Sequence, residues 1–233
     1  MSHKVRTAVR YTTKRLFNNI TKNRLRKRVI SRFANKIGLL YFGTVDQHSD
    51  DHKVVRGFTV STSHKDNNYC VGSIGGYDTI IVDRSDATVT QPNRSIIIYN
   101  WLIISFDLHT KQDIPHFFLE ANNKDSGAYK ALFDTFPTLK EINLGIFETY
   151  GVDFTSRFSL NTKPSDSIQI ERLFPANTAR TIGTHFWPLS AEQHEGILYI
   201  YSDDLKITPN LMNKMFETGL WLAEHLDNQA ELV

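Results

Sequence analysis

The N-terminal part of the chain carries an apolar residue at every third or fourth position. The clearest series has spacings of four, four, four and three, at Leu25, Val29, Phe33, Ile37 and Leu40. This period places the apolar side chains on one stripe of an α-helix, and many of the positions between them are basic. We therefore expect residues 1–45 to form one or two amphipathic helices.

The period changes to two in the next part of the chain, which is typical of β-strands. Gly75 and Gly76 separate two alternating stretches, and such a pair predicts a hairpin turn. The polar residues 64–68 favour a further turn. The connections are too short for helical crossovers, so we expect an antiparallel sheet. The expected strands cover residues 53–61, 69–74, 77–83, 96–108 and 116–120.

Helical periods return after residue 123, mixed with two further strands. Pro175 ends one short helix because proline lacks the hydrogen-bond donor, and Thr208 followed by Pro209 is a typical helix start. Helices are expected at 126–136, 165–173, 176–185 and from 208 to about 227, a helical or mixed segment at 139–150, and strands at 157–162 and 197–201. Together these elements predict an α+β fold, with helices packed on the apolar face of an antiparallel sheet.

The basic residues are concentrated at the N-terminus. Residues 1–45 contain 12 of the 27 Lys and Arg residues and no acid, because the first acidic residue is Asp46. The other 15 basic residues share the rest of the chain with all 25 acidic ones. The sequence therefore predicts a basic helical arm at 1–45 and an α+β domain at 46–233. Most of the apolar periodicity lies after Gly43, so the domain is expected to fold without the arm.

Such a charge asymmetry indicates a polyanionic partner. An amphipathic helix rich in Lys and Arg is typical of proteins that bind the surface of anionic membranes. The same cations could instead contact the phosphates of a nucleic acid or of the ribosome. The residues expected to bind the anionic surface are Lys22, Arg24, Arg26, Lys27, Arg28, Arg32 and Lys36.

Cysteine content and hydropathy point to the cytoplasm. The single cysteine, Cys70, has no partner for an internal disulfide, and it is expected to be a small buried residue. The most apolar run, 96–106, is shorter than the roughly 18 residues that cross a bilayer. We expect a cytoplasmic protein that associates with the membrane from its surface.

No catalytic motif stands out, and neither a cofactor nor a metal is expected. The sharpest metal candidates are His48, Asp50, Asp51 and His52, which are ligand types but match no known spacing. A solvated acidic loop is the favoured interpretation of this segment. A metal-dependent enzyme built around His48 stays as an alternative, beside the two binding functions.

The second half resembles an uncharacterised bacterial family of unknown function. The similar motifs are Asp153-Phe154 with Phe158, then Leu173-Phe174-Pro175, then a Leu-Tyr-Ile-Tyr strand at 198–201. The resemblance implies a bacterial origin and an α+β fold, and it brings no catalytic residues. We therefore expect a non-enzymatic binding or scaffold protein that docks through its basic arm on the cytoplasmic face of the membrane.

Overall fold

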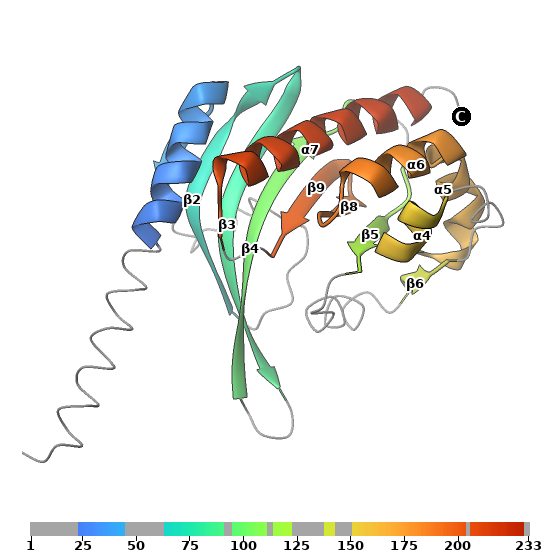
Figure 1. The fold of residues 1–233 in the computed structure, drawn as a ribbon, viewed down its shortest axis with the longest axis horizontal. Helices are drawn as coiled ribbons and strands as arrows, with labels where there is room; N and C mark the ends of the chain where they lie inside the picture. Colours follow the sequence, from blue (N-terminus) through green and yellow to red (C-terminus); the bar gives the residue numbers. More distant parts are fainter. Residues whose placement is uncertain are drawn as a thin grey trace, which may run out of the picture.

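A nine-stranded antiparallel sheet with helices on one face forms the fold (Figure 1). The computed structural model describes residues 23–44, 63–90, 95–110, 114–122, 138–142, 151–203 and 206–230. The strand order is β1-β2-β3-β4-β9-β8-β5-β7-β6. The strands are β1 (Leu40–Gly43), β2 (Ser63–Ile74), β3 (Tyr77–Thr90), β4 (Ser95–Asp107), β5 (Phe117–Ala121), β6 (Lys140–Glu141), β7 (Phe158–Thr162), β8 (Ser190–His194) and β9 (Ile197–Ser202). The expected α+β fold is confirmed.

The helices at 23–37, 167–173, 176–185 and 209–230 follow the expected apolar periods, whereas the helix at 152–157 was not expected. Residues 23–37 form a helix that we call the basic helix. The others are α4 (Val152–Arg157), the 3₁₀ turn η2 (Pro164–Asp166), α5 (Ser167–Leu173), α6 (Ala176–His185) and α7 (Pro209–Ala230). Thr208 caps α7, since the backbone N–H of Leu211 donates to its hydroxyl at 3.1 Å. The proline that follows the cap begins the helix, as the sequence predicts.

The hairpin turn at Gly75 and Gly76 is confirmed. Both residues have positive φ angles, 62° and 92°, which the type I′ turn between β2 and β3 requires. A second hairpin, between β8 and β9, turns at Glu195 and Gly196 with φ angles of 51° and 77°. Strand β8 was not expected, because its Ser-Ala-Glu-Gln-His sequence lacks apolar alternation.

The expected turn at 64–68 is wrong, because these residues belong to β2. Within this strand the register of pairing with β3 shifts between Asn67 and Cys70, and Asn68 adopts a φ of 53°. This irregularity is a β-bulge, where Asn is one of the residues that tolerate a positive φ. The expected strand at 53–61 and helix at 126–136 lie outside the described residues. Within 139–150 the structure describes β6 and not a helix.

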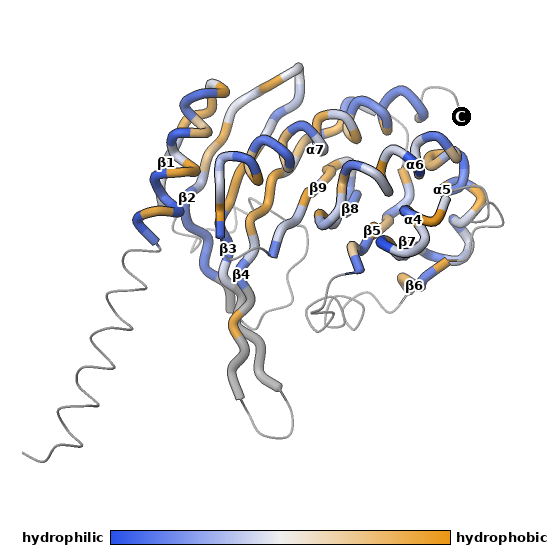
Figure 2. Tube along the Cα trace, viewed as in Figure 1, coloured by the Kyte–Doolittle hydropathy of each residue, from blue (hydrophilic) through white to orange (hydrophobic). Residues whose placement is uncertain are grey.

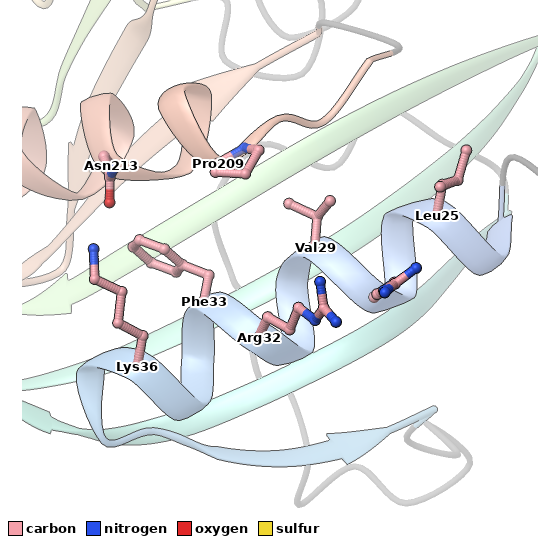
Figure 3. Close-up of a pocket in the computed structure, with 8 residues that line it drawn as sticks. Leu25, Val29, Arg32, Phe33, Lys36, Pro209 and Asn213 are labelled. Atoms are coloured by element: carbon pink, nitrogen blue, oxygen red, sulfur yellow. The ribbon is translucent and has the colours of Figure 1, made fainter.

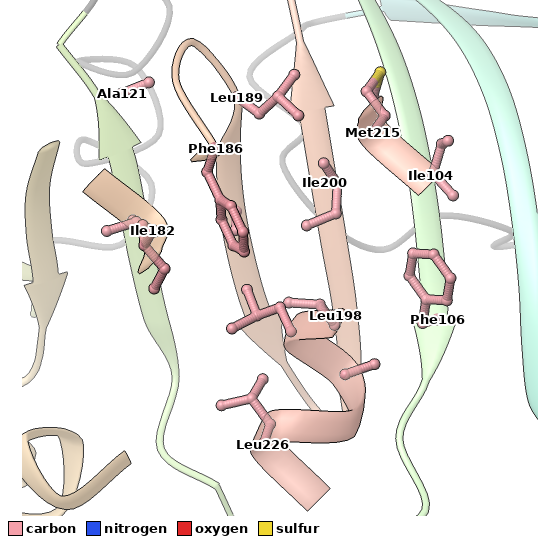
Figure 4. Packing of buried hydrophobic residues seen from close by; sticks show 14 of the residues in the cluster. Ile104, Phe106, Ala121, Ile182, Phe186, Leu189, Leu198, Ile200, Met215 and Leu226 are labelled. Carbon is pink, nitrogen blue, oxygen red and sulfur yellow. The ribbon is translucent and has the colours of Figure 1, made fainter. Parts of the chain in front are cut away.

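The core lies between the sheet and the helices. Alternate residues of the central strands, such as Ile104, Phe106, Leu198 and Ile200, meet the apolar side of α7 (Figure 4). Hydrophobic residues are concentrated along the central strands in Figure 2. Helix α7 approaches closely at Gly219, where an added Cβ would lie 2.2 Å from the Phe106 ring. That glycine therefore sets the distance between helix and sheet.

The basic helix contributes to the same core. Ile30 and Ala34 are fully buried, and Phe33 packs edge-to-face against Phe216 of α7 with ring centroids 6.1 Å apart. The expectation that core residues lie almost entirely after Gly43 is therefore wrong for this part of the arm. Half-buried Val29 and Ile37 also pack against the core. Three of the predicted stripe residues, Val29, Phe33 and Ile37, thus contact the body of the protein.

Candidate functional site

The predicted anion-binding residues divide into two groups by their position on the basic helix. Arg26 faces the sheet, where its Nε donates to Asp83 Oδ2 at 2.9 Å and its Nη2 donates to the other carboxylate oxygen. Asn68 donates to the same carboxylate at 3.0 Å and accepts a 2.7 Å hydrogen bond from the Tyr41 hydroxyl. Arg26 is therefore an anchor of the helix, and its charge is neutralised inside the fold.

The second group forms a row on the exposed side of the helix. Arg24, Arg28, Arg32 and Lys36 follow at intervals of four residues, and all four are exposed. Side chains four apart lie one above another, so the row is continuous along the helix. Lys27 lies on the opposite flank, with its amine 6.0 Å from the centre of the Tyr41 ring. Lys22 lies outside the described residues.

The cationic row borders a groove between the basic helix and the start of α7 (Figure 3). The apolar part of its lining is Leu25, Val29, Phe33 and Pro209. Val29 and Phe33 point toward α7 in Figure 3, and Leu25 lies at one end with 61% of its surface exposed. Leu25 and Pro209 are exposed and Val29 is half-buried, so the groove offers apolar surface that the fold itself does not cover, whereas Phe33 is buried at its base.

The polar lining of the groove is positively charged. It comprises Arg28, Arg32 and Lys36 from the basic helix and Asn213 from α7, and none of the described lining residues is acidic. The cavity volume is about 410 Å³, within the range of roughly 300–1,000 Å³ typical of small-molecule sites. An apolar floor beside three cations favours a ligand that has both an apolar and an anionic part.

A larger cavity lies on the other side of α7. It has a volume of about 710 Å³, lies between α6 and α7, and shares Asn213 with the groove. Its lining includes both Lys214 and Glu217, so it has no excess of one charge. The Lys214 amine also donates to the carbonyl of Trp187, and burial lowers the pKa of this amine. The groove beside the basic helix is therefore the better candidate for an anion.

Two histidines that are far apart in the sequence meet at the β5–β8 pair. The rings of His116 and His194 lie 4.3 Å apart, and His116 Nε2 is 2.8 Å from the Glu192 carboxylate. The hydroxyl of Tyr201 donates to the other oxygen of Glu192 at 2.6 Å. Burial is the main cause of the lowered pKa of His194. Both oxygens of the buried Glu192 are thus occupied, which indicates a structural network.

The remaining chemical candidates give no catalytic site among the described residues. Cys70 is buried in the core, as expected, and burial raises the pKa of its thiol to about 12. A thiol with this pKa is protonated at neutral pH and is a poor nucleophile. The metal candidates His48, Asp50, Asp51 and His52 lie outside the described residues. Within the described part of the chain, no three His, Cys, Asp or Glu side chains cluster as metal ligands.

None of the helices that the structure describes is long and apolar enough to span a bilayer.

No protein-family model matches the sequence, and no curated protein matches it either. A solved structure with a similar fold is that of the mycobacterial trehalose monomycolate transport factor A, TtfA, with a TM-score of 0.50. The match covers 87% of this chain and 93% of that chain at 10% sequence identity. At this identity the similarity is one of fold.

Proposed function

We propose that this protein is a non-enzymatic binding protein that docks on an anionic membrane surface through the exposed flank of its basic helix. The observation that carries the proposal is the row of Arg24, Arg28, Arg32 and Lys36 on one exposed flank. Because the row is held on a packed helix, its four charges reach a flat surface together. Each cation near an anionic leaflet contributes about 1 kcal/mol, so four contribute roughly 4 kcal/mol at low salt.

Burial of the apolar stripe changes how such docking can occur. Phe33 is buried, and Val29 and Ile37 are packed against the core. These side chains are therefore not available for insertion as a free amphipathic helix would insert them. Leu25 is exposed, as is Leu40 at the other end of the stripe. Docking is consequently expected to depend on charge, with Leu25 as a small apolar contact.

A lipid surface fits this flank better than a nucleic acid does. Phosphate-backbone binding uses cations and has no need of apolar surface among them. Here the exposed Leu25 and the groove lie directly beside Arg28 and Arg32. Mixed cationic and apolar surface is the pattern of membrane-surface helices.

The test is sedimentation of the full chain with vesicles of phosphatidylglycerol and phosphatidylcholine. The variant Arg24→Gln/Arg28→Gln/Arg32→Gln/Lys36→Gln is expected to lose vesicle binding at low salt. Wild-type binding is expected to weaken steeply as salt rises, because screening shortens the range of each charge to about 8 Å at physiological ionic strength. Vesicles of pure phosphatidylcholine should not bind either protein.

A charge-matched variant separates the row from net charge. Lys140, Lys163, Arg172 and Arg180 are exposed and lie outside the basic helix. Changing these four to Gln removes the same charge and should leave vesicle binding close to that of the wild type. Equal losses in both variants, or tight RNA binding without vesicle binding, would refute membrane docking.

A further inference from the structure

We infer that the groove between the basic helix and α7 binds one alkyl chain of an anionic phospholipid, with the phosphate on Arg28, Arg32 and Lys36. This inference rests on the proposed docking and goes beyond it, because it assigns a defined lipid site to part of the docking flank. Docking by charge requires only an anionic surface, whereas this site also requires the groove to accept an alkyl chain.

The apolar half of the site is built by two elements. Val29 and Phe33 extend from the basic helix toward α7, and Pro209 faces them from the first turn of α7 (Figure 3). Phe33 is held in place by its edge-to-face contact with Phe216, whose ring also lies 6.0 Å from Phe106 of β4. The floor is therefore rigid and is connected to the core. A preformed apolar groove binds an alkyl chain with little loss of conformational entropy in the protein.

The charged half of the site selects the head group. Arg28, Arg32 and Lys36 line one side at intervals of one helical turn, and Asn213 adds an amide from α7. Phosphate accepts bidentate hydrogen bonds from Arg and a charge-assisted bond from Lys. The described lining residues carry no acid that would repel it. A zwitterionic head would bring a cation into the same position, so we expect it to bind more weakly.

The groove is open to the same side as the docking row. Leu25, at one end, is 61% exposed, and Arg28 and Arg32 belong to both the row and the lining. A protein docked through the row thus has the mouth of the groove at the lipid surface. One alkyl chain of a phospholipid can enter the groove from the leaflet along Leu25, and the phosphate of that lipid then stays beside the cations.

The experiment measures heat of binding of palmitoyl lysophosphatidylglycerol to the full chain, below the concentration at which the lipid forms micelles. Saturable binding is expected, with weaker binding of palmitoyl lysophosphatidylcholine and of glycerol phosphate, which lacks the chain. Arg28→Gln/Arg32→Gln should weaken binding by at least about tenfold, since hydrogen bonds to charged groups are strong. Asn213→Trp, which fills the groove and leaves every cation in place, should abolish it.

The control variant Lys163→Gln/Arg172→Gln removes two exposed cations that belong neither to the groove nor to the docking row. It should bind the lysolipid like the wild type, and thermal melts should show that all variants are folded. Lysolipid binding that is absent, or unchanged in Asn213→Trp, overturns the groove site. If the protein binds vesicles although lysolipid binding contradicts the groove site, the docking proposal stands without a groove site. Loss of both kinds of binding in the wild type refutes the two proposals together.

Discussion

Among single residues, Arg26 has a structural role, because its side chain pairs with Asp83 of the sheet. Its ion pair with Asp83 leaves the two side chains only 13% and 10% exposed. Changing Asp83→Asn keeps the shape of the side chain but removes the negative charge that pairs with the guanidinium. Loss of one partner of a buried pair costs about 3–5 kcal/mol, and for this partly exposed pair we expect about 2 kcal/mol, measured by urea denaturation.

The matched control is Asp78→Asn, because Asp78 is an exposed aspartate of the same strand. Its effect should stay within about 0.5 kcal/mol, as for most surface substitutions. The double variant Arg26→Gln/Asp83→Asn should lose less stability than the two single changes summed, since they remove one interaction. Strict additivity of the two changes would contradict the assigned ion pair.

At the scale of elements, the basic helix is a structural part of the domain and not a separate arm. Ile30 of this helix is fully buried, whereas Leu25 on the same helix is 61% exposed. Ile30→Ala removes packed methyl groups and should lower the free energy of unfolding by about 2–4 kcal/mol. Leu25→Ala should change it by less than about 0.5 kcal/mol. Urea denaturation measures both values, and the slope of the free energy of unfolding against urea concentration should be the same as in the wild type.

Similar small effects for the two alanine variants would mean that the helix is not packed on the sheet.

The packing of the basic helix also makes deletion of residues 1–45 an unsuitable test of docking. Such a deletion removes Ile30, Phe33 and Ala34 from the core together with the cations. Substitutions on the exposed flank, by contrast, leave the packed side of the helix intact.

For the molecule as a whole, one half-buried carboxyl makes global stability depend on pH. Glu120 lies on β5 between core residues Leu119 and Ala121, so its side chain is on the sheet face away from the described helices. Burial raises the pKa of its carboxyl to about 7, and Glu141 adds repulsion. The folded state therefore binds this proton more tightly than the unfolded state, so this group destabilises the protein as pH rises from about 4.5 to 7.

The variant Glu120→Gln is expected to match the wild type near pH 4 and to exceed its stability at pH 8. The gain is on the order of 1 kcal/mol, because partial solvent exposure reduces the effect of the shift. Glu141→Gln, which removes only the repulsion, should give a smaller gain in the same direction. Thermal melts across this pH range measure the difference, and a difference that is constant with pH would contradict the raised pKa.

Many of the helices, strands and turns could be predicted from local sequence patterns. The Gly75-Gly76 hairpin, the helix start at Thr208-Pro209 and the end of α5 before Pro175 each depend on backbone preferences of a few adjacent residues. Where the local pattern did not predict a strand, pairing with neighbouring strands determined the structure. The polar residues 64–68 belong to β2 because β3 pairs with them on one side. Strand β8 is likewise specified by its neighbours β5 and β9.

Period and charge are local properties, so the amino-acid pattern alone was enough to predict an amphipathic, basic N-terminal helix. Which of its cations are exposed depends on the tertiary contacts of the helix. Arg26 is neutralised by Asp83, which is 57 positions away, and no local pattern identifies such a partner. The groove is likewise formed by side chains of the basic helix with Pro209 and Asn213 of α7. A helical period specifies which face is apolar, but the position of the opposing element determines how much of that face is covered and where a ligand can bind.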